Sequence, residues 1–223
     1  MDSEPELFAH HYAEAGLTER SVSFWGKAGR KSTARSAMAE AAAQLQKGLD
    51  QLTLLPDTPE RQRQELEFRS SLGAVLLGVR GYAGLETGHA YARARELWEQ
   101  LGSPSDFLHV PYGQARYHAH RGEFDLALRL DEDLLRLSRQ HDDSAGLVLG
   151  HYSSGRSLML TGRFASSLMH LEDVLALYDP ISHSSLVQQV GEAPRVNSHA
   201  LLGIVLLSRL SEPSISTEQG CGR

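Results

Sequence analysis

Apolar residues recur at steps of three and four along most of this 223-residue chain. In the clearest case, from Phe164 to Tyr178, large apolar side chains occupy positions 164, 168, 171, 175 and 178. Such spacing places them on one face of an α-helix. Apolar and polar residues do not alternate with period two over any useful length. The pattern therefore predicts an all-α protein.

Proline and glycine residues indicate where the helices begin and end. We expect helices over residues 5–15, 18–37, 38–55, 59–77, 91–101 and 196–210. Residues 57–60, Asp-Thr-Pro-Glu, are a helix-start signal, because a capping side chain precedes a proline and an acid in the first turn. Residues 103–106, Ser-Pro-Ser-Asp, predict a second start of this kind, and the glycine-rich stretch 79–88 predicts a connection.

Two stretches of the chain resemble each other at an offset of forty residues. They coincide without a gap at Tyr112/Tyr152, Arg116/Arg156, Gly122/Gly162, Phe124/Phe164, Leu128/Leu168, Glu132/Glu172, Asp133/Asp173, Leu135/Leu175 and Leu137/Leu177. The glycine between two helical stripes is typical of the turn of a helical hairpin, since glycine accepts positive φ. The offset predicts stacked antiparallel hairpins over residues 1–209, with the clearest units at 105–141 and 145–179.

The C-terminal end of this array is expected to be uncovered. The last helix has no partner helix after it, and the polar residues 210–223 predict a disordered tail. Several apolar side chains of that helix should then be partly exposed: Val196, Leu201, Ile204, Val205 and Leu207. Such an edge suggests self-association, a partner, or a chain that is part of a larger protein.

Charge and composition exclude some kinds of partner. Lys and Arg number 22 against 28 Asp and Glu, a net charge of −6, which gives no electrostatic footprint for nucleic acid or an anionic membrane. The single cysteine, Cys221, permits neither an internal disulfide nor a thiolate metal cage. Acidic residues open the chain, and no apolar run approaches eighteen residues. We therefore expect a cytoplasmic protein.

The repeated units resemble a known family. The pattern Gly-x-Phe-x-x-Ala at Gly122, Phe124 and Ala127, with Ala115 seven residues before the glycine, is similar to the tetratricopeptide repeat (TPR). The second unit departs from the pattern at Ser167, and the period of forty exceeds the usual thirty-four. The resemblance implies a right-handed solenoid with a concave groove that holds peptides.

Longer phrases resemble a particular group of proteins. PELFAHHYAEAGLTERSVSFWGKAGRKS, LPDTPERQRQEL, GYAGLETGHAYARARELWEQLG and LEDVLALYDP are similar to the helical region that follows the nucleotide-binding domain of large bacterial signalling proteins, the predicted ATPases and adenylate/guanylate cyclase fusions. The resemblance covers about residues 5–207. It implies a non-catalytic sensor or scaffold region that binds a protein or peptide partner, or adjoining domains of a larger signalling protein. Cyclase or ATPase domains of such a protein would lie outside this chain.

The candidate catalytic and metal-binding motifs lack the residues or the spacing that their chemistry requires. Residues 26–32, GKAGRKS, lack a glycine at position 30, where a phosphate-binding loop needs one. His118 and His120 are two apart and His10 and His11 are adjacent, so neither pair shares a helix face as zinc ligands do. The acidic pairs at 132–133 and 172–173 are typical of a solvated helix surface. We expect no enzyme, metal or cofactor.

The repeated tyrosine and arginine pairs are the candidate binding residues. Four residues apart, each pair shares one face of its helix, and by resemblance these positions line the concave groove together with two histidines: Tyr112, Arg116, Tyr152, Arg156, His109 and His120. Arginine presents a planar fork to carboxylates, so the groove would contact an extended or acidic segment. Alternatively, the tyrosines pack between hairpins and the arginines pair with nearby acids. A third possibility is a small-ligand effector domain that regulates a neighbouring catalytic or transcriptional domain.

Overall fold

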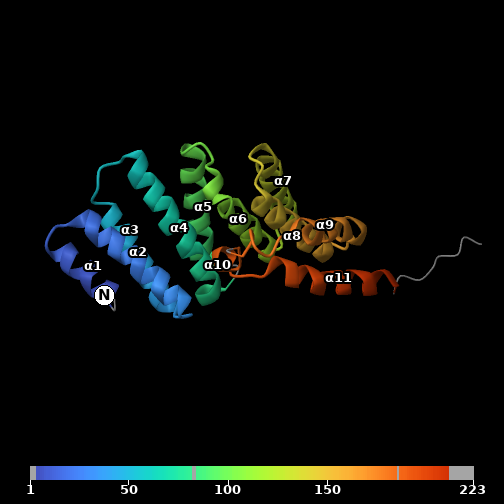
Figure 1. Ribbon diagram of the computed structural model, residues 1–223, viewed down its shortest axis with the longest axis horizontal. Coiled ribbons are helices and arrows are strands. Elements are labelled where there is room, and N and C mark those ends of the chain that lie inside the picture. Colours follow the sequence, from blue (N-terminus) through green and yellow to red (C-terminus); the bar gives the residue numbers. More distant parts are fainter. Residues whose placement is uncertain (1–3, 82–83, 185, 211–223) are drawn as a thin grey trace, which may run out of the picture.

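The computed structural model describes residues 4–81, 84–184 and 186–210, and the regular elements within these ranges are all helical (Figure 1). They are α1 (Pro5–Glu14), α2 (Thr18–Ala34), α3 (Met38–Leu52), α4 (Pro59–Arg80), α5 (Leu85–Gln100), the 3₁₀-helix η1 (Ser105–Phe107), α6 (His109–His120), α7 (Phe124–Gln140), α8 (Ser144–Leu160), α9 (Phe164–Leu177), α10 (Leu186–Val190) and α11 (Pro194–Leu210). The all-α prediction is confirmed for these residues.

Most helix ends agree with the signals in the sequence. Gly122 and Gly162 adopt φ values of 78° and 75° at the turns that join α6 to α7 and α8 to α9. At the start of α4, the Thr58 hydroxyl accepts a hydrogen bond of 3.2 Å from the Arg61 backbone N–H. These turns and this cap follow from local chemistry, because a glycine accepts positive φ and a hydroxyl can satisfy an unpaired amide at a helix start.

The connection predicted over residues 79–88 is confirmed only in part, because α4 continues to Arg80 and α5 already begins at Leu85. Glycines in this part of the chain serve packing between helices. A Cβ at Gly73 would lie 2.9 Å from the Tyr91 ring, and one at Gly88 would collide with Tyr117. Gly73 and Gly88 lie where a large aromatic side chain approaches a helix backbone. In the sequence, glycines that are needed for such packing resemble the glycines of a loop.

The helix start predicted at residues 103–106 is also wrong. Ser103 has a φ of 57°, the chain then forms η1, and α6 begins only at His109. The Trp98 indole N–H donates a 3.0 Å hydrogen bond to the Pro104 carbonyl, and Phe107 is buried. Burial of these aromatic side chains overrides the local start signal.

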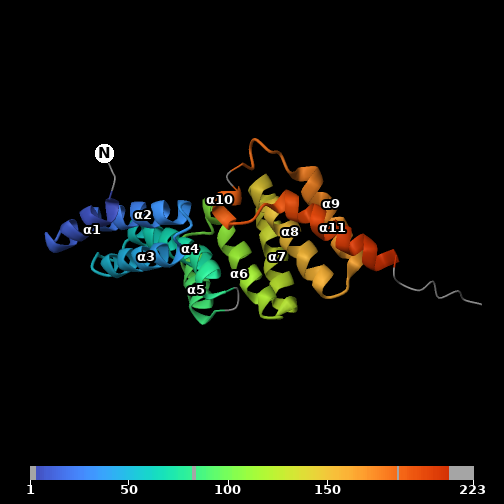
Figure 2. The same ribbon diagram turned by 90° about the horizontal axis from the view of Figure 1, so that it is seen from below.

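Neighbouring helices along the chain pack against one another in an elongated row (Figures 1 and 2). One apolar core joins α1 to α5 around Trp25 and Phe68. A second core, around Trp98, Tyr112 and Tyr152, includes residues of α10. The chain therefore folds back after α9 and contributes to the core of earlier helices.

Helix α11 packs against α9 and α8 and is only partly uncovered. The side chains of Val196, Ile204 and Leu207 are exposed, as expected, but Val205 is fully buried, so that part of the prediction is wrong. Residues 211–223, which contain most of the predicted tail, lie outside the described residues. Within the described ranges, no helix combines the length and apolar character needed to cross a membrane.

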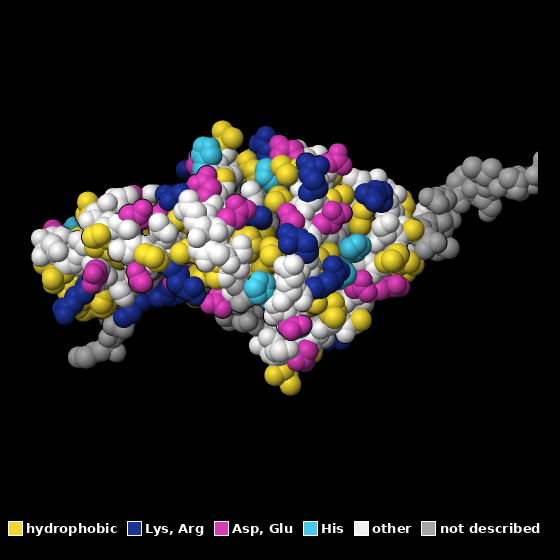
Figure 3. All heavy atoms as spheres, turned by 90° about the horizontal axis from the view of Figure 1, so that it is seen from above, with side chains coloured by type: hydrophobic (Ala, Val, Ile, Leu, Met, Phe, Trp, Pro, Cys, Tyr) yellow, Lys and Arg dark blue, Asp and Glu magenta, His cyan; other side chains and the backbone are white. Residues whose placement is uncertain are grey.

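The surface is of mixed charge. In Figure 3, Lys and Arg side chains lie among Asp and Glu side chains over much of the face shown. This distribution fits the small excess of 28 acidic over 22 basic residues. Two groups of ion pairs are centred on Glu65 and Glu192.

Candidate functional site

Glu192, between α10 and α11, lies against α6 and α8. Its carboxylate accepts a 3.1 Å hydrogen bond from the Tyr112 hydroxyl and forms an ion pair of 2.5 Å with Arg116 Nη2. Arg156 Nη1 lies 3.5 Å from the same carboxylate. One carboxylate thus joins three of the candidate binding residues, and we call Tyr112, Arg116, Tyr152, Arg156 and Glu192 the Glu192 cluster.

The helical repeat brings these residues together. Tyr112 and Arg116 lie one turn apart on α6, Tyr152 and Arg156 lie one turn apart on α8, and α6 packs directly on α8. The Arg156 guanidinium lies 5.5 Å from the centre of the Tyr152 ring, which fits a cation–π contact. The Tyr152 hydroxyl accepts a 3.0 Å hydrogen bond from the Asn197 side-chain amide of α11. Three helices therefore fix the cluster.

Residues 186–192 attach to this surface by more than the carboxylate, and we call them segment 186–192. Leu186 and Val190 are buried in the core that contains Tyr112 and Tyr152. Arg116 Nη1 donates a 3.0 Å hydrogen bond to the Val190 carbonyl. The segment thus combines two apolar contacts, one backbone contact and one charged contact.

The tyrosines and arginines of the Glu192 cluster are buried. Tyr112, Arg116, Tyr152 and Arg156 expose 1, 4, 3 and 8% of their surfaces. Burial raises the pKa values of the Tyr112 and Tyr152 hydroxyls, so both tyrosines stay neutral and able to donate hydrogen bonds at pH 7. A single carboxylate, whose side chain is 13% exposed, accordingly faces two buried arginines at close range.

The structure brings the four repeated residues together, but they are largely buried and contact segment 186–192 and α11. The alternative in which the arginines pair with an acid of the chain describes this arrangement. That acid, Glu192, is 80 residues from Tyr112 along the chain, so spacing alone did not reveal it. The signal available in the sequence was the pair of apolar residues Leu186 and Val190, four positions apart, followed by an acid.

The two candidate histidines occupy different places. His120 lines a cleft of about 340 Å³ with Tyr152, Arg156, Glu192, Asn197, Ala200 and Leu201. Partial burial and then the neighbouring Arg156 and Arg116 lower the pKa of His120 to about 4. His109 begins α6 with its ring 5.8 Å from that of Phe107, and burial lowers its pKa to about 4. Both rings are neutral at pH 7 and add no positive charge.

Asp131 of α7 is a second buried acid near the cluster. It is fully buried, and its counterpart forty residues later is the equally buried Leu171. Burial raises the pKa of Asp131 to about 8, although attraction to Arg156 opposes part of that rise. The carboxyl group is therefore mostly protonated at pH 7.

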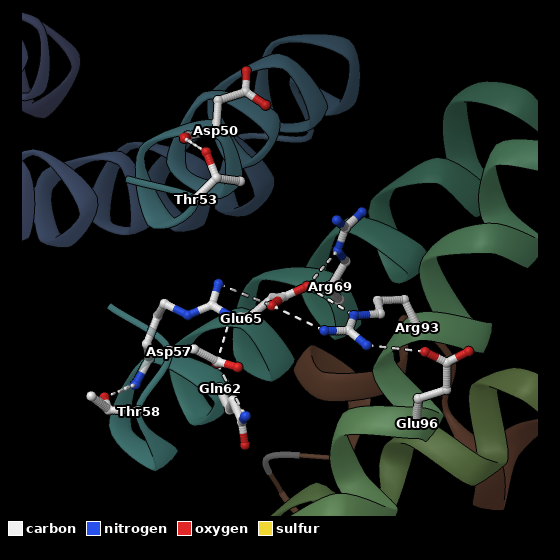
Figure 4. Close-up of polar contacts among 10 residues, drawn as sticks. Asp50, Thr53, Asp57, Thr58, Gln62, Glu65, Arg69, Arg93 and Glu96 are labelled. Carbon is white, nitrogen blue, oxygen red and sulfur yellow. Dashed lines mark hydrogen bonds and ion pairs between the residues drawn. The ribbon is translucent and has the colours of Figure 1, made fainter. Parts of the chain in front are cut away.

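A separate group of ion pairs surrounds Glu65 on α4 (Figure 4). The Glu65 carboxylate lies 3.5 Å from Arg61, 3.6 Å from Arg69 and 3.1 Å from Arg93 of α5. We call these four residues the Glu65 cluster. Arg93 also contacts Glu96 at 3.1 Å. The cluster joins α4 to α5 and leaves its cations partly in contact with water.

The other sequence candidates have structural roles. Residues 26–32 lie within α2, where a Cβ at Gly29 would approach Leu45 to 2.8 Å, so this glycine permits close helix packing. Of the acidic pairs, Glu132 and Glu172 are exposed, whereas Asp173 lies 3.2 Å from His151 Nδ1. Within the part of the chain that the structure describes, no group of three or more His, Cys, Asp or Glu could hold a metal ion.

The described residues form an all-helical protein in which two tyrosines and two arginines gather around the Glu192 carboxylate. No protein-family model matches the chain. An uncharacterized protein of Rhizobium meliloti (strain 1021) is 32% identical over 89 residues, which are 40% of this chain and 9% of that protein. The matched part thus spans less than a tenth of a much longer relative.

Proposed function

We propose that the chain is a non-catalytic, TPR-like interaction module. The hairpins α6–α7 and α8–α9 would stack as units of a right-handed solenoid. The forty-residue repeat, the glycine turns at Gly122 and Gly162, and the packing of each helix on the next support this proposal. An array of this kind exposes a long surface for protein or peptide partners.

One observation carries the proposal: Tyr112, Arg116 and Arg156 converge on a single carboxylate. Arginine is suited to carboxylates because its planar fork offers several donors, and tyrosine adds a rigid amphipathic surface. The partner we infer is an extended or acidic segment of another protein or of an adjoining domain. Its carboxylates would bind where Glu192 lies.

The wider setting we propose is the sensory or protein-binding region of a bacterial ATPase/cyclase-type signalling protein, working in the cytoplasm. The phrases that resemble the helical regions of such proteins support it. The greater length of the relative from Rhizobium meliloti fits a helical region within a large protein. Any catalytic domain would lie outside these 223 residues.

Matched peptide pairs test the proposed binding. An array of extended peptides would present each acidic sequence beside its amide form, with Glu replaced by Gln and Asp by Asn. We expect acidic members to bind the full chain at least about tenfold more tightly, since a charged hydrogen bond contributes about 1.5–3 kcal/mol. Arg156→Gln should abolish the preference, whereas Arg129→Ala, at an exposed position of α7, should keep it. Equal binding of acidic and amide peptides would refute the proposal.

The cleft beside the cluster favours a second candidate, a small-ligand effector site. Its volume of about 340 Å³ lies at the lower end of the range for small-molecule pockets, about 300–1,000 Å³. Thermal shift with small carboxylates such as succinate and citrate separates the candidates. A saturable rise in Tm with one of them, together with an inert peptide array, would favour the effector site.

Self-association through α11 is a further part of the proposal. Val196, Ile204 and Leu207 expose 66, 50 and 67% of their surfaces on this helix. Sedimentation velocity over a range of concentrations measures the association. Leu207→Glu should shift the chain toward monomer, and an unchanged distribution would remove α11 as the contact.

A further inference from the structure

Segment 186–192 has the features of a bound peptide. It forms one short helix, α10, and Figure 2 shows this helix beside α6, away from α9, which it follows in the chain. Leu186 and Val190 enter the core, Arg116 holds the Val190 carbonyl, and Glu192 supplies the carboxylate. Its contacts are therefore those that an external segment would make with α6 and α8.

The charges at this surface favour exchange for a more acidic segment. Two buried arginines face the one carboxylate of Glu192, and Arg156 is 3.5 Å from it, farther than Arg116. The nearby Asp131 is mostly protonated at pH 7, and His120 and His109 are neutral. The Nε and Nη2 atoms of Arg156 are buried without a hydrogen-bond partner among the described residues, so a ligand that brings a second carboxylate to Arg156 gains an advantage over the segment.

We propose that segment 186–192 is a built-in competitor, which occupies the arginine-bearing surface of α6 and α8 until an acidic segment of a partner displaces it. Because the segment belongs to the same chain, its effective concentration at this surface is about millimolar. A partner displaces it only if the partner's affinity and concentration together outweigh this intramolecular binding. The identity of the displacing partner rests on the proposed function. Occupancy by the chain's own segment does not, and it can be measured separately.

The contacts define the partner's chemistry. The segment places apolar residues at positions 186 and 190, one helical turn apart, and a carboxylate at position 192. We expect the displacing segment to have two apolar residues separated by three positions. An acid should follow two positions after the second apolar residue, with another acid close by. The second acid would meet Arg156.

Hydrogen exchange on the full chain tests the occupancy. In Glu192→Gln, the backbone amides of residues 186–193 should exchange at least about tenfold faster than in the wild type, because opening becomes easier once the charge pair is lost. Glu172→Gln, an exposed glutamate of α9, is the matched control and should leave these rates unchanged. Unchanged exchange in Glu192→Gln overturns the proposal.

Peptide binding tests the competition. A fluorescein-labelled peptide with the sequence of residues 184–195, SSLVQQVGEAPR, is followed by fluorescence anisotropy. We expect it to bind Glu192→Gln at least about tenfold more tightly than wild type or Glu172→Gln, and to lose binding when its own glutamate becomes glutamine. Faster exchange without tighter peptide binding also overturns the proposal. Failure of the proposed function is a different result, namely equal binding of the acidic and amide peptides.

A second variant protects the test against misfolding. Glu192→Asp keeps the charge but shortens the side chain by one methylene, so both exchange and peptide affinity should fall between those of wild type and Glu192→Gln. Circular dichroism confirms that each variant retains its helices. A folded Glu192→Asp chain with wild-type exchange and wild-type peptide affinity would contradict the proposal.

Discussion

Two glutamates, the buried Glu65 and the partly buried Glu192, each contact more than one arginine, but the two clusters are assembled differently. Two partners of Glu65, Arg61 and Arg69, lie four residues away on the same helix. The partners of Glu192 lie on α6 and α8, with Tyr112 80 residues distant in the chain. The first cluster forms when α4 folds and α5 packs on it, whereas the second requires the chain to fold back.

Water reaches the two sets of arginines unequally. In the Glu65 cluster, the side chains of Arg61, Arg69 and Arg93 are 16, 29 and 36% exposed. In the Glu192 cluster, Arg116 and Arg156 expose only 5 and 10%. When an arginine that reaches water loses its partner carboxylate, the free energy of unfolding falls only a little, whereas the loss is large when the arginine is buried. We therefore expect the stability of the protein to depend more strongly on Glu192 than on Glu65.

The largest expected effect comes from neutralising each glutamate in turn. Glu192→Gln should lower the free energy of unfolding by about 3 kcal/mol, because two buried arginines lose their counter-charge. Glu65→Gln should cost only about 1 kcal/mol, since its arginines can turn toward water. Urea denaturation measures both, with Glu172→Gln as a control that should stay close to wild type. Equal losses at the two sites would contradict the comparison.

The second expectation concerns pH and Asp131. The folded pKa of about 8 lies above the model-compound value of 3.8, so the unfolded chain binds fewer protons between these values and stability falls as pH rises. Each pH unit within this window costs up to about 1.36 kcal/mol. Asp131→Asn should remove this fall between pH 5 and 8, as measured by urea denaturation of both proteins across that range.

The Asp131 result also sharpens the comparison of the clusters. If stability did not change between pH 5 and 8 relative to Asp131→Asn, Asp131 would already be ionised and would share Arg156 with Glu192. The loss in Glu192→Gln would then be smaller. The lowered pKa values of His109 and His120 act in the opposite direction below their unfolded pKa, and the difference between wild type and variant cancels their effect.

A third, smaller effect tests the local origin of the Glu65 cluster. Thr58 caps α4 through the Arg61 backbone N–H, and Arg61 also pairs with Glu65. Thr58→Ala should cost about 1 kcal/mol, which urea denaturation can measure, while hydrogen exchange in segment 186–192 should not change. Faster exchange in that segment would show that the two clusters are coupled and not independent.

The smallest expected effect is that of salt. Double-mutant cycles for Arg93 with Glu65 and for Arg116 with Glu192 measure the coupling energy of each pair. Raising sodium chloride to about 1 M shortens the Debye length to about 3 Å, so the Arg93 coupling should fall by a few tenths of a kcal/mol. The buried Arg116 coupling should change less. An equal or larger change for Arg116 would indicate that its cluster opens to water.

Much of the fold was predictable because its signals are local. Steps of three and four residues identify helices, and Gly122 and Gly162 have the positive φ that a hairpin turn requires. The predicted helix boundaries differ from the structure where a residue packs against a side chain that is distant in the sequence. The pattern of residues 79–88 predicts a loop that is too long, because Gly88 belongs to α5 and makes room for the ring of Tyr117, a distant residue.

The candidate site was predictable in part for the same reason. The repeat offset identified Tyr112, Arg116, Tyr152 and Arg156 as neighbours, because equivalent positions of stacked units face one another. It did not identify Glu192, which lies outside the repeat, or the burial of Val205 on the last helix. Their places depend on how the chain returns over α6 and α8.

The sequence by itself determined the helices, most of their ends and the alignment of two tyrosine and arginine pairs, because these follow from backbone geometry and side-chain spacing over a few residues. Only the tertiary structure decided which carboxylate meets the arginines and that the chain's own segment covers them. Such contacts join residues up to 80 positions apart, and burial of Leu186 and Val190 selects them through the core they enter. The local pattern of Leu186, Val190 and Glu192 marks a segment that can bind, but it does not specify the distant surface to which that segment binds.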